Sequence, residues 1–290
     1  MYEKDSLREY IESSELRIFS KEIKVRLSKE LALKYDRGCY NNYLESIQMC
    51  LNMINTLKIK YPGNARPILY IYIVPDDNYS KLLKIPLTFD KGKGGGKPVR
   101  CYDLDGFNSA YGLSQNMLEN KLEKDKNISR IENKIHELSH IIHSQFFMTN
   151  QTICEGFAEA LPLFALGLEE SFTEYREAIK KLSEDQILSA QELLNSEGNG
   201  SFGTEILIPN RSCRISYISS YLFVRGCIES IISKYNFSKA QAVQYFLEIV
   251  KQSNCRNEWL IYDIANAIGI SKEELLNGKQ IQKSILSSLI

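Results

Sequence analysis

Three histidines and three glutamates have the residue types and the spacing in this sequence that are best suited to chemistry. All three histidines of the 290-residue chain, His136, His140 and His143, lie within one short stretch. Residues 136–140 read HELSH, an H-E-x-x-H motif, and residues four apart lie one above the other on an α-helix, so two imidazoles can bind one zinc ion. Glu137 is turned roughly a quarter-circle away, where its carboxylate can take a proton from metal-activated water. The spacing predicts a hydrolytic site with one zinc per chain.

A catalytic zinc site of this kind needs a third protein ligand, and the sequence offers a carboxylate on the next predicted helix. In TICEGFAEALPLF, residues 152–164, Glu155 and Glu159 are four apart and therefore share one helix face. His143 is the competing ligand, but it lies one turn, about 5.4 Å, beyond His140. We interpret His143 as a residue that supports the ligands or lines the cleft.

The two motifs together resemble the gluzincins, zinc metallopeptidases with H-E-x-x-H and a downstream glutamate, and most closely their peptidase MA-type members. The stretch ISYISSYLFVRGCIESIISKYN, residues 215–236, is similar to a helix of such enzymes in which a tyrosine precedes an aromatic-rich run. The resemblance covers roughly residues 98–240. It implies that His136, His140 and Glu155 are the zinc ligands and that Glu137 is the general base.

The spacing departs from one branch of that family. In the aminopeptidase branch eighteen residues separate the second histidine from the ligand glutamate, whereas here fourteen precede Glu155 and eighteen precede Glu159. The E-G-x-A-E motif of the family binds through its first glutamate, which favours Glu155 as the ligand. Glu159 is then expected to orient a ligand histidine.

Hydrolysis of an amide also needs a hydrogen-bond donor for the oxyanion that forms. Because the histidines are already assigned, a tyrosine or an arginine must provide it. Tyr217 and Tyr221 are four residues apart on one helix face, and Tyr217 aligns with the tyrosine of the resembling family. Tyr221 is the alternative, although most of the seventeen tyrosines are expected only to pack.

Composition narrows the class of partner and the compartment. Lys plus Arg and Asp plus Glu both number 36, so net charge favours neither nucleic acid nor an anionic membrane as a partner. The charged N-terminus and the lack of eighteen consecutive apolar residues predict a cytoplasmic protein outside the membrane. The seven scattered cysteines are typical of reduced thiols. The expected partner is a peptide or protein substrate.

The periodicity of the apolar residues predicts an α+β, mainly helical fold. We expect the first sixty residues to be helical, a buried strand at 67–74, a surface loop at 92–98 and an edge strand at 99–106. The remaining chain is expected to form helices at 129–147, 155–167, 170–181, 184–195, 213–234, 238–252, 257–268 and 272–288. A capping box of Ser129 and Glu132 would start the first of these.

These elements predict two domains of the gluzincin or zincin-like kind. Residues 1–125 would form an N-terminal α/β lobe with a small sheet and an edge strand, and residues 126–290 a helical lobe that carries the zinc site. The two lobes would flank a zinc cleft. The predicted function is zinc-dependent hydrolysis of peptide bonds. The alternatives are a catalytically weak or inactive gluzincin-like binding or regulatory module, and a helical interaction protein with an accidental motif.

Overall fold

The computed structural model describes the chain in segments and divides it into two compact units. The described residues are 10–12, 16–18, 21–28, 37–63, 68–74, 96–99, 109–114, 127–146, 151–168, 173–196, 205–208, 211–253 and 257–289. Side chains are described for most of 45–63, 131–146, 153–168, 177–194, 215–253 and 259–289. Unit 1 comprises residues 1–58 and 62–141, and unit 2 comprises residues 59–61 and 142–290.

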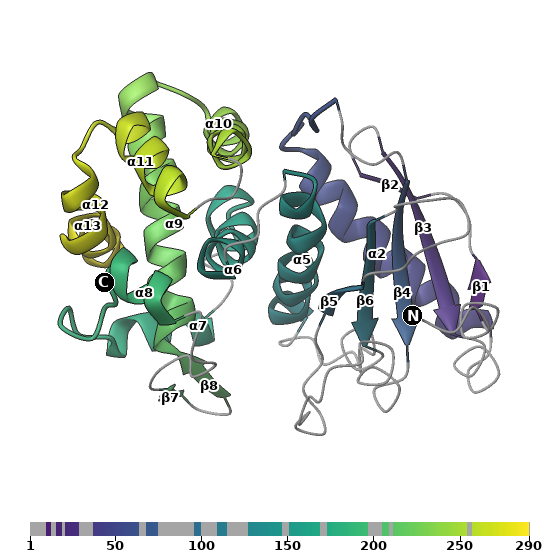
Figure 1. The fold of residues 1–290 in the computed structure, drawn as a ribbon. Coiled ribbons are helices and arrows are strands. Elements are labelled where there is room, and N and C mark those ends of the chain that lie inside the picture. The colour runs from purple at the N-terminus through teal and green to yellow at the C-terminus, as the bar shows by residue number, and fades with distance from the viewer. Residues whose placement is uncertain are drawn as a thin grey trace. The chain divides into compact units, whose positions relative to one another are not determined.

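The backbone of unit 1 contains a mixed sheet. Its strands are β1 (Tyr10–Glu12), β2 (Leu16–Ile18), β3 (Lys21–Ser28), β4 (Ile68–Val74), β5 (Gly96–Val99) and β6 (Ser109–Ser114). They follow the order β1-β3-β4-β6-β5, and β2 also pairs with β3 (Figure 1). The pairs β3–β4 and β4–β6 are parallel, whereas β1, β2 and β5 run antiparallel to their neighbours. Helix α2 (Arg37–Asn55) lies between β3 and β4 in the chain, as a parallel pair requires a crossover.

The predicted fold class, an α+β fold with a small N-terminal sheet lobe, is wrong. The strands of unit 1 are described by their backbone alone, and none of the residues whose side chains the structure describes lies in a strand. This part of the chain is mainly helical and does not support a fold class built on that lobe. The expectation of helix throughout the first sixty residues also failed, because β1, β2 and β3 precede α2. The sequence KEIKVRLS of β3 alternates polar and apolar residues, a period of two that favours a strand. The edge strand expected at 99–106 lies outside the described residues except for Val99, the last residue of β5.

Unit 2 consists of helices and one hairpin. Helix α5 (Asn127–Ser144) contributes residues to both units. The other elements are α6 (Gln151–Ala160), the π-helix η3 (Leu161–Ala165), α7 (Thr173–Lys181), α8 (Ala190–Ser196), the strands β7 (Glu205–Ile208) and β8 (Arg211–Arg214), α9 (Ile215–Tyr235), α10 (Lys239–Gln252), α11 (Asn257–Ile268), α12 (Lys272–Asn277) and α13 (Gln280–Leu289).

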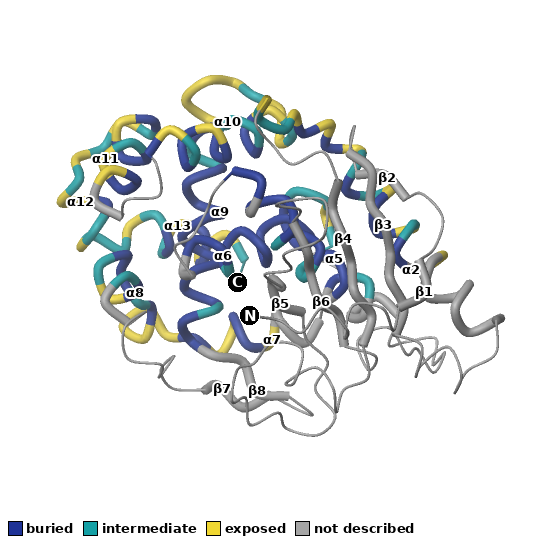
Figure 2. The backbone as a smooth tube through the Cα atoms, turned by 45° about the vertical axis from the view of Figure 1, so that its right-hand side comes forward, coloured by how far each residue is buried: buried dark blue, intermediate teal, exposed yellow. Residues whose placement is uncertain are grey.

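Helix α9 forms the centre of unit 2. It packs against α6, α8, α10, α11 and α13, and Figure 2 shows most of it in the dark blue of buried residues. Its sequence is apolar on all sides, which is typical of a helix enclosed by others. By length and composition α9 could also cross a membrane, with a mean hydropathy of 1.2 over its most apolar window, but 78% of that window is buried inside the structure. Burial of this extent is what a core helix requires.

The helical half of the chain differs from expectation mainly at helix ends. The single helix predicted for 272–288 is divided into α12 and α13, because Asn277 ends α12 and Lys279 has a positive φ of 51°. Helix α8 begins at Ala190, six residues after the predicted start at residue 184. Ser238 and Ser271 each begin a helix with a capping box, accepting hydrogen bonds from the backbone amides of Gln241 and Glu274.

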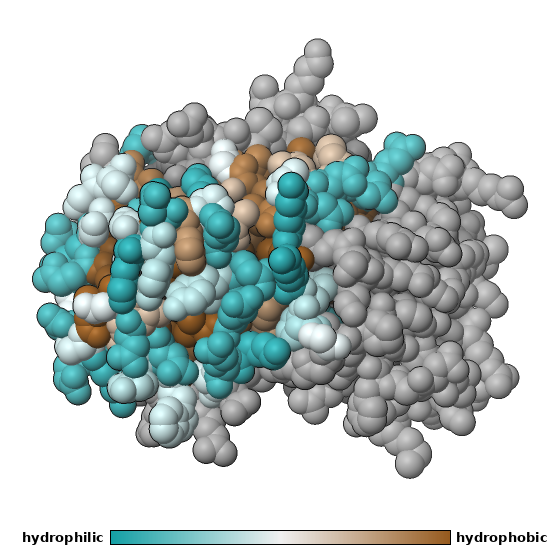
Figure 3. Space-filling view, turned by 90° about the horizontal axis from the view of Figure 1, so that it is seen from above, coloured by the Kyte–Doolittle hydropathy of each residue, from teal (hydrophilic) through white to brown (hydrophobic). Residues whose placement is uncertain are grey.

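On the face seen in Figure 3, hydrophobic residues lie between hydrophilic ones in the coloured part of the surface. The largest exposed aromatic side chains of the described residues lie on α11. Trp259 is 56% exposed and Tyr262, three residues later on the same face, is 49% exposed. Scattered exposure of this kind is ordinary for a protein surface.

Candidate metal centre

Helix α5 has one buried apolar face, and the histidine motif lies on its more exposed sides. Ile135, Leu138 and Ile142 are almost completely buried, whereas Glu137 and His140 are half-buried on other sides of the helix. The helix begins at Asn127, so Ser129 lies inside its first turn and does not precede it as the predicted capping box required. Ser139, between the two motif histidines, is buried and donates a 2.6 Å hydrogen bond to the carbonyl of Ile135. The apolar face therefore fixes the rotation of the helix that carries the motif.

His136, His140 and Glu155 come together in a group that could hold a metal ion. One ligand atom from each residue lies within 4.8 Å of those of the other two. The two imidazoles are one turn apart, with ring centroids 5.0 Å from each other and ring planes at 83°. His140 and Glu155 are half-buried, and His136 lies at the boundary between half-buried and buried. The partial exposure of His140 and Glu155 suits residues that must meet an ion from solvent.

The donor set fits a catalytic zinc ion. Two histidines and one glutamate are the ligands of one common class of hydrolytic zinc site, which keeps a further coordination position open. Bonds of about 2.0 to 2.2 Å in a tetrahedral site place the ligand atoms about 3.3 to 3.6 Å apart. In this group the ligand atoms lie within 4.8 Å of one another, which is farther apart than in a formed zinc site. Small rotations of the side chains can bring them closer together. Metals that prefer only oxygen ligands suit this set less well.

Glu155 occupies an exceptional position on α6. Every residue from Ile153 to Phe164 is buried except Glu155. Glu159, one turn later, is only 5% exposed and is not part of the metal-capable group found among the described residues. A carboxylate that keeps solvent contact in an otherwise buried helix suits a ligand that must meet an ion. Of the two glutamates left open by their spacing, Glu155 therefore has the surroundings of a ligand.

The chain leaves α-helical geometry directly after this glutamate pair. Pro162 lies in the π-helix η3, where the backbone N–H of Leu166 donates to the carbonyl of Leu161, five residues earlier. A proline inside a helix cannot donate to the carbonyl four residues before it, which favours a local change in winding. The sequence signal was the proline of EALPLF, within the helix predicted for 155–167.

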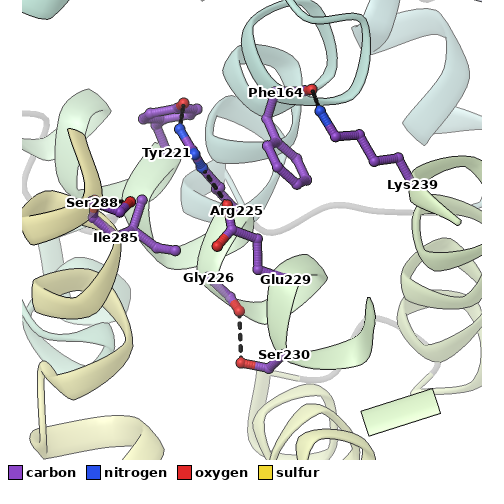
Figure 4. A network of polar contacts seen from close by, with 9 residues as sticks. All are labelled: Phe164, Tyr221, Arg225, Gly226, Glu229, Ser230, Lys239, Ile285 and Ser288. Carbon is purple, nitrogen blue, oxygen red and sulfur yellow. Dashed lines mark hydrogen bonds and ion pairs between the residues drawn. The ribbon is translucent and has the colours of Figure 1, made fainter. Parts of the chain in front are cut away.

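Phe164 of η3 lies between two cations in Figure 4. The guanidinium carbon of Arg225 is 4.9 Å from the centre of its ring, and Lys239 Nζ is 4.5 Å from it. Lys239 also donates a 3.0 Å hydrogen bond to the backbone carbonyl of Phe164. These contacts attach the end of the α6–η3 segment to α9 and α10, since cations bind favourably over aromatic faces.

The two candidate tyrosines on α9 have different surroundings. Tyr217 is half-buried, whereas Tyr221 is completely buried and its hydroxyl accepts a 2.8 Å hydrogen bond from Arg225 Nη1 (Figure 4). Arg225 also places its Nε 2.8 Å from Glu229 Oε1. The predicted alternative donor, Tyr221, is therefore held in the core of unit 2.

His143 is not part of the metal-capable group. It is buried, and its ring meets the ring of Phe157 edge-on with centroids 6.4 Å apart. Phe157 in turn stacks on Phe246 of α10, with centroids 6.4 Å apart and planes at 5°. His143 thus belongs to the aromatic packing that holds α6 in unit 2.

Sequence reasoning overlooked two residues of the α6 and α9 packing. Arg225 is a buried charge in an apolar helix. Because a buried charge needs hydrogen-bond or ion-pair partners, the lone arginine in the run YLFVRGC was a signal that such partners lie nearby. Gly156 follows Glu155 directly, and a glycine inside a helix is a signal of close packing.

The sequence was also compared with known proteins. No model of a known protein family matches this chain, and no curated protein matches it significantly.

Proposed function

We propose that this chain is a zinc-dependent metallopeptidase of the gluzincin type that hydrolyses peptide bonds of a peptide or protein substrate in the cytoplasm. The observation that supports this proposal is the convergence of His136, His140 and Glu155, with ligand atoms within 4.8 Å of one another. Glu137 lies between the two histidines of the same helix. Two imidazoles, one ligand carboxylate and one adjacent carboxylate are the side chains that metal-assisted amide hydrolysis uses.

The residues of the chain take separate roles in this proposal. His136, His140 and Glu155 hold the zinc ion. A zinc ion in such a site acts as a Lewis acid and lowers the pKa of water to near neutrality. Glu137 accepts a proton from the attacking water and returns it to the leaving amine. Tyr217 donates a hydrogen bond to the oxyanion that develops on the scissile carbonyl.

Zinc content is the first test of the proposal. Elemental analysis of the purified protein should find about one zinc per chain in the wild type and none in His140→Ala. His143→Phe is the matched control, because it removes an imidazole from the same helix outside the metal-capable group but keeps an aromatic ring against Phe157, and it should retain zinc. A wild-type protein without zinc, even after reconstitution, would exclude the proposed function.

Cleavage of a peptide library is the second test. The zinc-loaded wild type should cleave at least some peptides, and removal of zinc by a chelator should abolish cleavage until zinc is restored. Zinc binding without cleavage of any peptide would contradict the proposed activity and favour a binding or regulatory module.

A further inference from the structure

Helices α6 and α9 cross at a distance that only glycine permits. A Cβ atom at Gly156 would lie against the backbone carbonyl oxygen of Ser220 and 2.7 Å from Cγ2 of Val224. It would also lie 2.8 Å from the carbonyl carbon of Ser220, and Cβ atoms essentially never approach other heavy atoms within 3.0 Å. A methyl group at this position must therefore displace a backbone, because the Ser220 carbonyl cannot rotate away as a side chain can.

Both sides of this crossing are fixed by other contacts in unit 2. On α9, Ser216, Ser219 and Ser220 are buried, and Ser219 Oγ accepts a 3.1 Å hydrogen bond from the backbone amide of Leu188. On α6, Phe157 follows Gly156 and contacts the rings of His143 and Phe246. A shift of α6 away from α9 would disturb this packing, since protein interiors have little free volume.

The crossing lies beside two residues of the proposed mechanism. Glu155 directly precedes Gly156 on α6, and Tyr217 precedes Ser220 by less than one turn of α9. We infer that the contact between Gly156 and Ser220 is the positioning device that holds the Glu155 carboxylate in place as a metal ligand and sets its distance from Tyr217. The inference rests on the proposed function, because it assigns Gly156 a role toward the same zinc ion.

The physical reason is the precision that a metal ligand needs. Ligand groups must lie within about 0.5 Å of their working geometry, and residues that support ligands typically change metal affinity about 10- to 100-fold when they are altered. A methyl group at residue 156 would separate the helices by an amount comparable with that tolerance. Glu155, as the adjacent residue, would move with α6.

Gly226→Ala provides a matched control for Gly156→Ala. Gly226 lies on α9, the partner of α6 in the first crossing, but it faces α13, where a Cβ would meet the side chain of Ile281 and lie 3.3 Å from Cγ1 of Ile285. Both variants insert one methyl group into a tight helix crossing of unit 2. Only the first crossing contains a proposed metal ligand.

The experiment measures zinc affinity by competition with a chromophoric chelator, together with circular dichroism and the thermal unfolding midpoint of each variant. We expect Gly156→Ala to bind zinc at least about tenfold more weakly than the wild type. Gly226→Ala should lower the unfolding midpoint while it changes the zinc affinity less than about twofold. A comparable loss of affinity in both variants, or a folded Gly156→Ala with unchanged affinity, would overturn the inference.

A second pair of variants serves if Gly156→Ala does not fold. Gly156→Ala/Val224→Ala removes one of the two contacts that the new methyl group would make but leaves the Ser220 carbonyl in place, so it should still bind zinc more weakly than Val224→Ala alone. Equal affinity in these two proteins would overturn the inference. Absence of zinc from the wild type would instead overturn the proposed function and this inference together, so the two failures are distinguishable.

Discussion

Arg225 and Tyr221 form a hydrogen bond inside unit 2 that separates the roles of the two tyrosines on α9. Arg225 Nη1 donates to the Tyr221 hydroxyl over 2.8 Å, and the two side chains are 8% and 0% exposed. A phenol that is fully buried beside a cation contributes to packing and cannot meet a substrate without a rearrangement of the core. Tyr217, one turn earlier and half-buried, retains the exposure that an oxyanion donor needs.

Phenylalanine at each tyrosine position should therefore have a different effect. Tyr217→Phe should lower kcat about a hundredfold, which is typical for the loss of one oxyanion donor, with zinc content and stability nearly unchanged. Tyr221→Phe should leave kcat much less affected but lower the free energy of unfolding by about 1.5 to 3 kcal/mol, because the buried Arg225 loses an acceptor. Steady-state kinetics and urea unfolding on both variants provide the comparison. If Tyr221→Phe lost activity and Tyr217→Phe did not, the two roles would be exchanged.

The two glutamates of α6 should differ in their effect on zinc. Glu155→Ala removes a proposed ligand and should lower zinc affinity by more than about a hundredfold. Glu159→Ala should cost less, about ten- to a hundredfold, as expected for a residue that only supports a ligand. Chelator competition measures both affinities. A greater loss from Glu159→Ala would make Glu159 the ligand, in agreement with the eighteen-residue spacing of the aminopeptidase branch.

Glu137 should be needed for turnover and not for metal binding. Glu137→Gln keeps the size of the side chain but removes its basicity, so kcat should fall at least about a hundredfold while the zinc content stays near one per chain. Glu177→Gln on α7 is the control, because Glu177 is exposed and pairs with Lys180 over 3.1 Å on the surface. Unchanged turnover in Glu137→Gln would remove Glu137 from the mechanism.

The local parts of the fold were accessible from the sequence. The predicted bounds of α9, α10 and α11 lie within two residues of those in the structure, since an apolar period of 3.6 residues and capping residues act over short stretches. The H-E-x-x-H spacing likewise requires only one helix. These features depend on residues within a few turns of each other.

The remaining features depend on contacts between distant segments. Strand β3 forms its hydrogen bonds with the parallel strand β4, which follows in the chain only after α2. The alternation of polar and apolar residues in β3 is short, and the surrounding stretch was expected to be helical. The closeness of Gly156 to Ser220 and the position of Arg225 over Phe164 depend on how α6, η3 and α9 pack. Neither local propensity nor motif spacing contains that information.

Alkaline pH should destabilise the protein through two buried thiols. Burial raises the pKa of Cys50 on α2 from 9.0 to about 11 against the opposing charge of Lys134, and burial also raises the pKa of Cys227 on α9. The unfolded chain therefore loses these protons from about pH 9, whereas folded Cys50 keeps its proton until about pH 11. Because the folded state binds more protons in this interval, the free energy of unfolding falls as pH rises from 9 to 11 and is unaffected by these groups at lower pH. Urea unfolding under reducing conditions at pH 7.5 and pH 10 measures the difference.

Substitution separates this effect from that of other titrating groups. Cys50→Ala and Cys227→Ala should each be less stable than the wild type at pH 7.5, because each leaves a small cavity, but each should lose less additional stability between pH 7.5 and pH 10. Lysines and tyrosines elsewhere contribute equally to the wild type and to both variants, so they cancel in the comparison. If the free energy of unfolding fell equally in all three proteins, the two thiols would have the same pKa in the folded and the unfolded chain. That result would contradict the prediction, because burial in an apolar core raises the pKa of a thiol.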